Sequence, residues 1–451
     1  MGLPHHVSDE AGAADRGHAF GAAHADAIAV TVRTYRRLLQ EAAGVARADR
    51  QALGAALAQR LEPRWPELIA EIEGIAAGAR QDPLELIAIN ARTELLAGAG
   101  GPECSLVGRV SGASACLVQT WDWHPDLAPA RLLWTVIEQD GSWFTTATEA
   151  GILAKLGVNS RGVACGLNSL ASSADGGVGG LPIHLLLRLL LERCDGATDA
   201  LALLLNARTS ASACISVAVA EPDAAALFAV ELSPGGGVAL WPDEQGRLIH
   251  TNHFLAPLPT GVDTLAARHP GTLLRHRRLS DLLREGIDPL DALATHFPLG
   301  EPLCRHAGAD GDWTERRATL LTLSIDPGRP SFRLAAGPPC CSTLEEVLLP
   351  AQPATSAGAR RSRSRSTSTG RPACRTEGAA TSTGSRAAPS ARTACCAASR
   401  GSSPCWRSSR RSPRSTCRGS RRNDIRMRSA ASPKPATRSR TTATRTGDPT
   451  C

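Results

Sequence analysis

The chain has 451 residues and carries 50 Lys and Arg against 43 Asp and Glu, which gives a formal net charge of +7. Residues 351–451 hold 22 of the basic and 3 of the acidic residues, so the first 350 residues hold 28 and 40 and are net acidic. An acidic body gives no electrostatic support for nucleic-acid binding, so we expect no nucleic-acid partner.

Fourteen cysteines are spread over the chain. Those in the first 350 residues lie at wide, irregular intervals, with no CxxC pair and no Cys and His spacing typical of zinc sites. We therefore expect reduced thiols and no bound metal. The N-terminus lacks a basic-then-apolar signal, and no apolar run reaches membrane-spanning length. These features predict a cytoplasmic protein without a membrane partner.

Residues 1–103 are predicted to form a helical segment. Apolar residues recur at helical spacing in three stretches, 26–39, 66–79 and 84–96. Asp82 stands where the N-cap of the third helix is expected. Small residues over 16–28 mark a place where a helix can pack closely against another. A loose run of Gly, Ala and Pro over 97–103 then leads to Cys104.

After Cys104 the pattern changes to β-structure. β-branched or alternating segments predict strands at 115–121, 131–139, 143–149, 162–170, 214–221, 227–232, 237–241, 247–254, 319–326 and 331–336. Helices are predicted at 182–193, 199–207 and 272–284. Strands, then helices, then strands favour an α+β fold in stacked layers with the helices outside. We assign residues 104–350 to this domain.

Residues 351–451 have a different composition. They contain no Leu, Val or Phe and a single Ile, so they cannot bury enough apolar surface to fold. We interpret them as a disordered basic tail, or as the product of a GC-rich coding sequence read out of frame. A basic arm that binds nucleic acid is the alternative.

Cys104 is the first candidate for catalysis. The linker at 100–102 delivers it to a β-structure, and Asp122 follows one strand later. If the chain is cut between Glu103 and Cys104, one residue carries both a thiol nucleophile and an α-amine base. The thiol would make this cut itself by attacking the Glu103 carbonyl. The alternative is that Cys104 is a small core residue.

Several motifs resemble those of a known family. They are NARTELL (90–96), Glu103-Cys104-Ser105, QTWDWH (119–124), EAGILAKLGVNSRGVACGLNSL (149–170), LPIHLLLRLLLE (181–192), HTNHF (250–254) and TLLTLSIDP (319–327). Together they resemble the isopenicillin N acyltransferase family, the acyl-CoA:6-aminopenicillanic acid acyltransferases. These are autoproteolytic enzymes of the N-terminal-nucleophile (Ntn) hydrolase superfamily. The resemblance covers about residues 16–339.

The resemblance implies a four-layer αββα Ntn-hydrolase fold. It also implies self-cleavage between Glu103 and Cys104 into a small helical chain, which stays bound, and a large catalytic chain. Cys104 matches the family's nucleophile, and Asp122 matches the carboxylate beside the α-amine. Asn252 matches the oxyanion-hole amide, a donor that adds no charge to be desolvated.

Other positions are matched less directly. Arg317 corresponds to the arginine near the nucleophile, although Arg316 is adjacent and the sequence does not separate the two. Asn168 aligns with an active-site asparagine of the bile-salt hydrolases and is a candidate second polar contact. Trp121 and Trp123 are candidates for an acyl pocket, with core packing as the alternative.

Glu103 departs from the family, which commonly has Gly before the nucleophile. A charge beside the scissile bond could slow maturation. The resemblance predicts an enzyme that transfers or hydrolyses an acyl group from a small-molecule amide or thioester through an acyl-Cys104 intermediate. No cofactor is expected, and a coenzyme A thioester is a candidate substrate. The alternative is a catalytically inactive remnant of the family that never matures.

Overall fold

The computed structural model describes residues 2–99, 103–221, 224–297, 302–308, 312–329 and 331–350. The predicted linker at 100–102 and the predicted tail at 351–451 lie outside these residues. A short strand opens the chain, β1 (His5–Ser8), and helices follow it. They are α1 (Ala13–Ala23), α2 (Ala25–Glu41), α3 (Arg47–Leu61), α4 (Pro66–Gly78), α5 (Pro83–Asn90) and α6 (Arg92–Leu95). Asp82 caps α5 as predicted, accepting hydrogen bonds from the backbone N–H groups of Leu84 and Glu85.

Helices α1 and α4 pack closely because glycines lie at their crossing. A Cβ atom at Gly17 would lie 2.2 Å from the carbonyl oxygen of Glu71, and one at Gly74 would lie 2.3 Å from that of Ala14. Neither position therefore accommodates a side chain while the helices keep this distance. The run of small residues predicted to allow close helix packing has this role.

Strand β1 and the strands after α6 form two sheets. The eight-stranded sheet has the order β1-β4-β5-β6-β7-β8-β9-β10, and the six-stranded sheet has the order β11-β2-β3-β12-β13-β14. The first contains β4 (Arg131–Ile137), β5 (Trp143–Glu149), β6 (Leu156–Asn159), β7 (Val163–Ser169), β8 (Ala213–Glu221), β9 (Ala224–Ser233) and β10 (Gly236–Leu240). The second contains β2 (Glu103–Ser111), β3 (Ser114–Trp123), β11 (Arg247–His250), β12 (Ala318–Ile325), β13 (Ser331–Ala335) and β14 (Glu345–Leu348).

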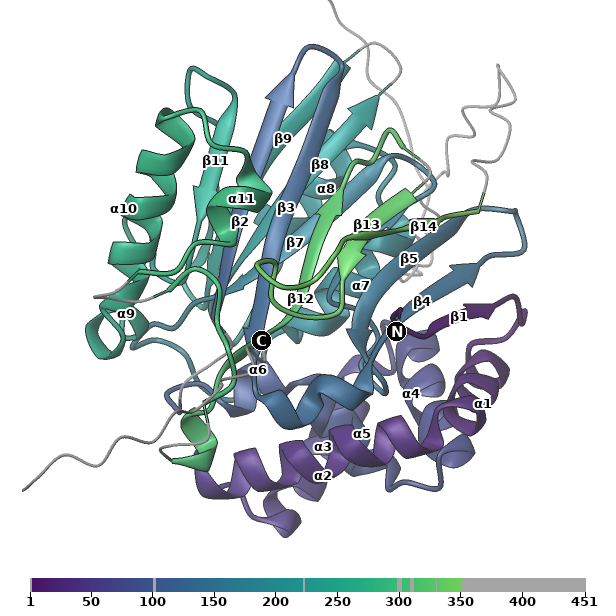
Figure 1. The fold of residues 1–451 in the computed structure, drawn as a ribbon. Coiled ribbons are helices and arrows are strands. Elements are labelled where there is room, and N and C mark those ends of the chain that lie inside the picture. Colours follow the sequence, from purple (N-terminus) through teal and green to yellow (C-terminus); the bar gives the residue numbers. More distant parts are fainter. Residues whose placement is uncertain are drawn as a thin grey trace, which may run out of the picture. The chain divides into compact units, whose positions relative to one another are not determined.

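The two sheets pack face to face, with helices on both outer faces (Figure 1). Helices α7 (Ile183–Arg193) and α8 (Ala197–Leu205) cover the eight-stranded sheet, while α10 (Gly271–Arg284) and α11 (Pro289–Leu293) cover the six-stranded sheet. Short elements connect these parts: η1 (Pro125–Ala130), α9 (Leu265–Arg268) and η2 (Trp313–Glu315). The arrangement is the predicted four-layer αββα architecture.

The buried side chain of Gln119 joins the two sheets through hydrogen bonds between β3 and β7. Gln119 on β3 donates from Nε2 to the carbonyl oxygen of Leu167 on β7 at 2.5 Å, and its Oε1 accepts from the Leu167 N–H at 3.2 Å. Gly166 makes room for it, because a Cβ there would lie 2.7 Å from Gln119 Oε1. The amide satisfies two backbone groups that would otherwise be buried without partners.

The structure differs from the predicted elements in a few places. The first 103 residues are not purely helical, because β1 pairs in parallel with β4 at the edge of the eight-stranded sheet. Helices α3, α9 and α11 and strands β2, β6 and β14 were not predicted. Strands β6 and β14 are only four residues long, too short for alternation to be recognised. Among the described helices, none combines the length and apolar character needed to cross a membrane.

Candidate active site around Cys104

Cys104 is the second residue of β2 and is 2% exposed. In the antiparallel pair of β2 and β3, Cys104 lies opposite Trp121, and Glu103 lies opposite Asp122. Directly opposed side chains share a face of a sheet, and successive side chains alternate. The thiol and Trp121 therefore face the other sheet, whereas Glu103 and Asp122 face α10 and its neighbouring loops.

The backbone nitrogen of Cys104 is held by Asn252. Its N–H donates to Asn252 Oδ1 at 2.9 Å, and Asn252 Nδ2 donates to the carbonyl oxygen of Ser169 at 2.9 Å. Asn252 thus contacts Cys104, the candidate nucleophile. In the uncut chain it accepts a hydrogen bond there, so a role as oxyanion donor requires its amide to rotate.

Two further donors converge on the carbonyl oxygen of Cys104. Asn168 Nδ2 lies 3.3 Å from it, and Arg275 Nη1 lies 3.1 Å from it. Arg275 is fully buried on α10 and also contacts Asn252 Oδ1 at 3.0 Å. Asn168 is therefore a polar contact of the candidate nucleophile, and Arg275 is a contact that the sequence analysis did not identify.

Asp122 is fully buried next to Cys104 in the pairing of β2 and β3. Its Oδ1 accepts a hydrogen bond from Thr319 Oγ1 at 2.6 Å, and its Oδ2 has no hydrogen-bond partner among the described residues. Burial raises the pKa of Asp122 to about 6. Burial and the charge of Asp122 together raise the pKa of the Cys104 thiol to about 12. The thiol of the uncut chain therefore needs a base to become a nucleophile at neutral pH.

The charge of Glu103 is neutralised by two arginines. Its Oε2 lies 3.0 Å from Arg275 Nη2 and 2.6 Å from Arg305 Nη2. Burial alone would raise the pKa of Glu103, but these guanidinium groups hold it below its ordinary value. The residue before the candidate cleavage point is therefore part of a buried ion-pair group.

We expect Glu103→Gln to destabilise the uncut chain. The neutral amide leaves Arg275 and Arg305 with incompletely compensated charges, which should lower the free energy of unfolding by about 2 to 3 kcal/mol. Urea denaturation of the variant in a Cys104→Ala background, which keeps the chain uncut, measures this. Glu244→Gln, at an exposed position, is the matched control. A loss equal to that of the control would contradict the ion-pair assignment.

Arg317 does not contact Cys104. Its Nη1 donates to the carbonyl oxygens of Thr314 and Arg316 at 2.9 and 2.8 Å, and its guanidinium lies 4.7 Å from the ring centroid of Trp123. Its charge contributes to the low pKa of Glu103. The guanidinium groups in direct contact with residues 103 and 104 come instead from Arg275 and Arg305.

Lys155 lies on the thiol face of β2 and β3. Its Nζ is 3.5 Å from the ring centroid of Trp121 and 3.5 Å from Glu149 Oε1. Burial lowers the pKa of Lys155 to about 7, and the charge of Lys155 lowers the pKa of the Cys104 thiol. A buried amine that titrates near neutral pH beside a thiol is a candidate proton acceptor.

A pocket opens on this same face. Cys104 itself is not among its lining residues, which are Arg92, Thr93, Leu96, Ala97, Gly98, Trp123, Lys155, Leu167, Ser169, Leu170, Ala171, Asp175, His184, Ala213, Leu265 and Arg268. Trp123 therefore lines a pocket, as its predicted role in an acyl pocket requires. Trp121 does not line this pocket, because its ring is packed against Lys155. One wall consists of residues that precede Cys104 in the chain.

The site residues missed by the sequence analysis come from different parts of the chain. Arg275 lies in a helix predicted to be amphipathic and basic, where nothing in the pattern separates a buried arginine from exposed ones. Arg305 lies in an irregular segment, and Lys155 precedes a strand too short to be recognised. Lys155 also lies within the segment 149–170 that resembles the family, and this resemblance was the one feature of the sequence that could have identified it.

Comparison with known proteins assigns the chain to a family. The family model described as acyl-coenzyme A:6-aminopenicillanic acid acyl-transferase matches residues 110–339. Among curated proteins, the acyl-coenzyme A:6-aminopenicillanic-acid-acyltransferase 40 kDa form of Emericella nidulans is 28% identical over 329 residues, which cover 71% of this chain and 89% of that protein.

Solved structures are also similar. An ortholog of N-acylethanolamine-hydrolyzing acid amidase from Caenorhabditis elegans is 15% identical, with a TM-score of 0.37 and coverage of 50% of this chain and 94% of that chain. Penicillin V acylase from Agrobacterium tumefaciens is 13% identical, with a TM-score of 0.34 and coverage of 52% and 82%. The family model spans about half of this sequence, and the chain belongs to the acyl-coenzyme A:6-aminopenicillanic acid acyl-transferase family.

Proposed function

We propose that this protein is an autoproteolytic acyltransferase that cuts itself between Glu103 and Cys104 and then uses Cys104 as an N-terminal nucleophile. The proposal is supported above all by the surroundings of Cys104. Cys104 is a buried cysteine whose backbone N–H is held by Asn252 and whose neighbour on β3, Asp122, has an unpartnered carboxylate oxygen. A core cysteine needs neither contact.

The self-cleavage step begins at the thiol. Lys155, with a pKa of about 7, takes the proton from Cys104 Sγ, and the sulfur attacks the carbonyl carbon of Glu103. The peptide nitrogen leaves with a proton and becomes the α-amine of Cys104. Water then hydrolyses the thioester, which releases the Glu103 carboxylate and restores the thiol. The low pKa of Glu103 means that its charge is already compensated by arginines, so it need not oppose this step.

The acyl-transfer step uses the residue created by the cut. The α-amine of Cys104 takes the thiol proton, and the sulfur attacks the acyl carbonyl of an amide or of a thioester such as acyl-coenzyme A. The leaving amine or thiol departs with that proton. An acceptor amine, or water in a hydrolytic reaction, then removes the acyl group from sulfur. The pocket lined by Trp123 and Leu170 is on the thiol face and is suited to the acyl chain.

The first 103 residues should remain bound after the cut. Glu71 on α4 forms buried ion pairs with Arg16 on α1 and Arg188 on α7, each at 2.8 Å. Asn90 on α5 donates to the carbonyl oxygen of Gly151 at 2.9 Å and accepts from the N–H of Leu153 at 3.0 Å. The pair of Glu71 with Arg188, the two hydrogen bonds of Asn90 and the pairing of β1 with β4 join the small chain to the large chain, while the pair with Arg16 lies within the small chain.

Maturation is directly measurable. We expect purified protein to contain two chains in the mass spectrum under denaturing conditions, with the large chain starting at Cys104 by N-terminal sequencing. The rate of the cut in freshly synthesised chain should rise with pH through about 7, where Lys155 loses its proton. A single uncut chain would instead support the inactive remnant.

A further inference from the structure

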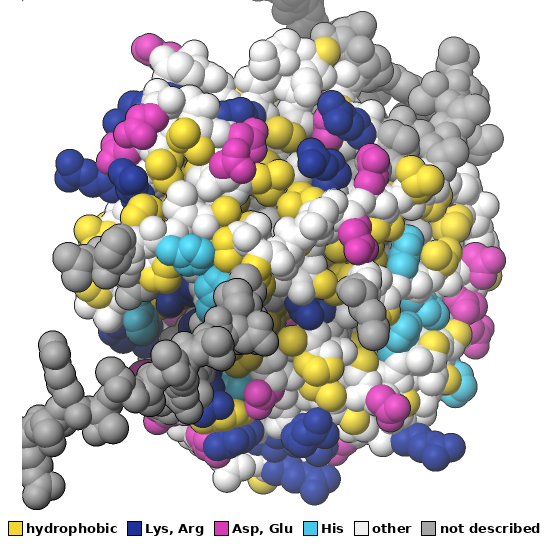
Figure 2. All heavy atoms as spheres, in the orientation of Figure 1, with side chains coloured by type: hydrophobic (Ala, Val, Ile, Leu, Met, Phe, Trp, Pro, Cys, Tyr) yellow, Lys and Arg dark blue, Asp and Glu magenta, His cyan; other side chains and the backbone are white. Residues whose placement is uncertain are grey.

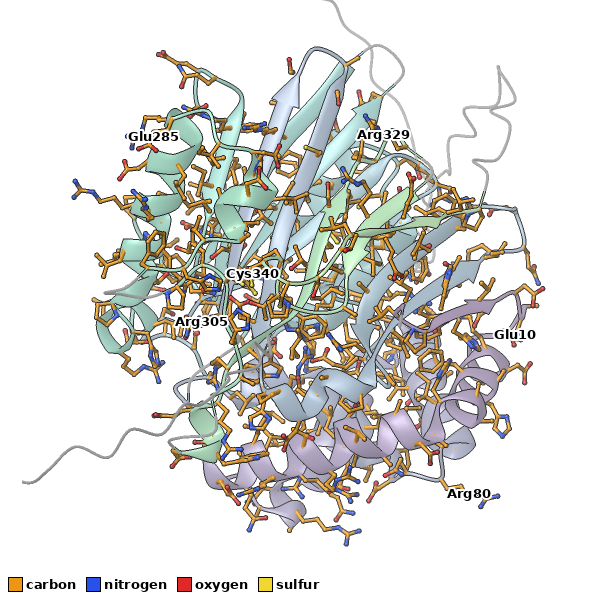
Figure 3. The ribbon with its side chains drawn as sticks, in the orientation of Figure 1. Glu10, Arg80, Glu285, Arg305, Arg329 and Cys340 are labelled. Carbon is orange, nitrogen blue, oxygen red and sulfur yellow. The ribbon has the colours of Figure 1, made fainter. Side chains whose placement is uncertain are left out.

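Four side chains outside the candidate active site form a compact cluster. They are His296, Cys304, His306 and Cys340, and their ligand atoms all lie within 4.8 Å of one another. His296 follows α11, Cys304 and His306 lie in the segment 302–308, and Cys340 follows β13. Figure 3 shows Cys340 close to Arg305, which lies between two of these residues in the chain.

Four of the six distances between the ligand atoms lie near those around one small tetrahedral cation, and the other two, from His296 to the sulfur atoms, are at most 4.8 Å. The two sulfur atoms are 3.4 Å apart, and the Nε2 atoms of His296 and His306 are 3.0 Å apart. His306 Nε2 lies 3.7 Å from Cys304 Sγ and 3.2 Å from Cys340 Sγ. Zinc bonds of about 2.3 Å to sulfur and about 2.0 Å to nitrogen give a tetrahedron with edges of roughly 3.3 to 3.8 Å.

The chemistry of the donors also selects the ion. Two thiolates and two imidazoles are the set found in closed structural Zn²⁺ sites, whereas Mg²⁺ and Ca²⁺ require oxygen ligands. Two thiolates balance the charge of Zn²⁺, so the complex is neutral beside the buried Cys304. Cys340 and both histidines are exposed, and Figure 2 shows histidine side chains at the surface of this face. A metal therefore has a path to the cluster.

We propose that His296, Cys304, His306 and Cys340 bind Zn²⁺ as a structural site. Binding releases the thiol protons and joins three loop segments that have no regular secondary structure of their own. The spacing along the chain conceals the site, because the ligands are separated by eight, two and thirty-four positions and are brought together only by folding. The expectation of a protein without metal rested on that spacing.

Arg305 connects the proposed zinc site to the candidate active site. Arg305, between two of the ligands, contacts Glu103 Oε2 at 2.6 Å. Its backbone N–H donates to Thr319 Oγ1 and its carbonyl oxygen accepts from the Thr319 N–H, each at 3.0 Å. Thr319 in turn donates to Asp122. Zinc would thus hold in place the segment that carries Arg305 against the cleavage point.

The test measures zinc rather than activity. Full-length protein purified under reducing conditions from zinc-supplemented cells should contain about one Zn per chain by elemental mass spectrometry. His306→Ala and Cys340→Ser, at exposed positions, should each lose most of this zinc and lower the melting temperature. Cys341→Ser, at the adjacent exposed thiol, and His18→Ala, at an exposed histidine on α1, should retain it.

Cobalt provides a second measurement. Co²⁺ added to the metal-free protein should give the visible absorption of a tetrahedral ion and a thiolate charge-transfer band, both missing from Cys340→Ser. Two results would overturn the proposal. One is zinc content in His306→Ala and Cys340→Ser equal to that of the wild type. The other is wild-type protein that contains no zinc although it was purified under reducing conditions from zinc-supplemented cells.

Discussion

Cys104→Ala is expected to leave the protein as one uncut chain and to abolish acyl transfer. The substitution removes the one sulfur atom that, in the proposed mechanism, attacks Glu103 and later carries the acyl group. We expect transfer from an acyl thioester to an amine to fall by at least about 10⁴-fold, the scale of losing a covalent nucleophile. Intact mass and product release measure the two losses on the same sample.

Two further variants make the Cys104 result specific. Cys116→Ala, on β3, also removes a free thiol and should leave both cleavage and transfer unchanged. Cys104→Ser retains a polar side chain of similar size, so its circular dichroism and melting temperature report whether the site stays folded. An uncut Cys104→Ala chain that still transfers acyl groups would show that Cys104 is a core residue and that our mechanism is wrong.

Asp122→Asn is expected to inactivate the enzyme while stabilising the uncut chain. The freed α-amine of Cys104 needs a nearby carboxylate to orient it, and the unpartnered Oδ2 of Asp122 is suited to that role. Loss of this charge should reduce acyl transfer by about 10²- to 10⁴-fold. A variant with no loss of transfer would remove Asp122 from the mechanism.

The stability effect of Asp122→Asn follows from the direction of its pKa shift. The folded chain holds the Asp122 proton up to about pH 6, above the ordinary value of 3.8. Between these pH values the folded state binds more protons than the unfolded state, so the free energy of unfolding falls as pH rises. The full cost of burying the charged Asp122 carboxylate is therefore present above about pH 6. Removing the charge should raise the free energy of unfolding at pH 7 by about 3 kcal/mol.

The gain is measured by urea denaturation of two uncut chains, Cys104→Ala with and without Asp122→Asn. It should disappear at pH 4, where Asp122 is protonated in the folded chain. Asp9→Asn, at an exposed carboxylate, is the matched control and should change stability by less than about 0.5 kcal/mol. Equal stability of the two chains at pH 7 would contradict the raised pKa of Asp122.

Much of this protein could be predicted from its sequence because the relevant signals are local. Alternation along strands and helical spacing along α2 and α4 reflect which face each element buries, and a cap such as Asp82 acts within three residues of itself. The family motifs also located Cys104, Asn168 and Asn252, which the structure brings into contact.

The tertiary structure decided which charges surround those residues. Arg317, or its neighbour Arg316, was expected near Cys104, but Arg275 and Arg305 are the arginines that contact residues 103 and 104. A long side chain can extend toward the protein or toward solvent from the same sequence pattern, and only packing of the neighbouring elements selects between them. The charge of Glu103 is likewise neutralised only because packing brings Arg275 and Arg305 against it.

The sequence by itself determined the order of most of the longer elements, the layered architecture and the position of the candidate nucleophile, because each depends on residues that are neighbours in the chain or on a recognisable motif. Only the tertiary structure revealed the parallel pairing of β1, the amine of Lys155 on the thiol face, and the cluster around Cys340. These features join residues far apart in the chain, and their distances are set by how the sheets and loops pack.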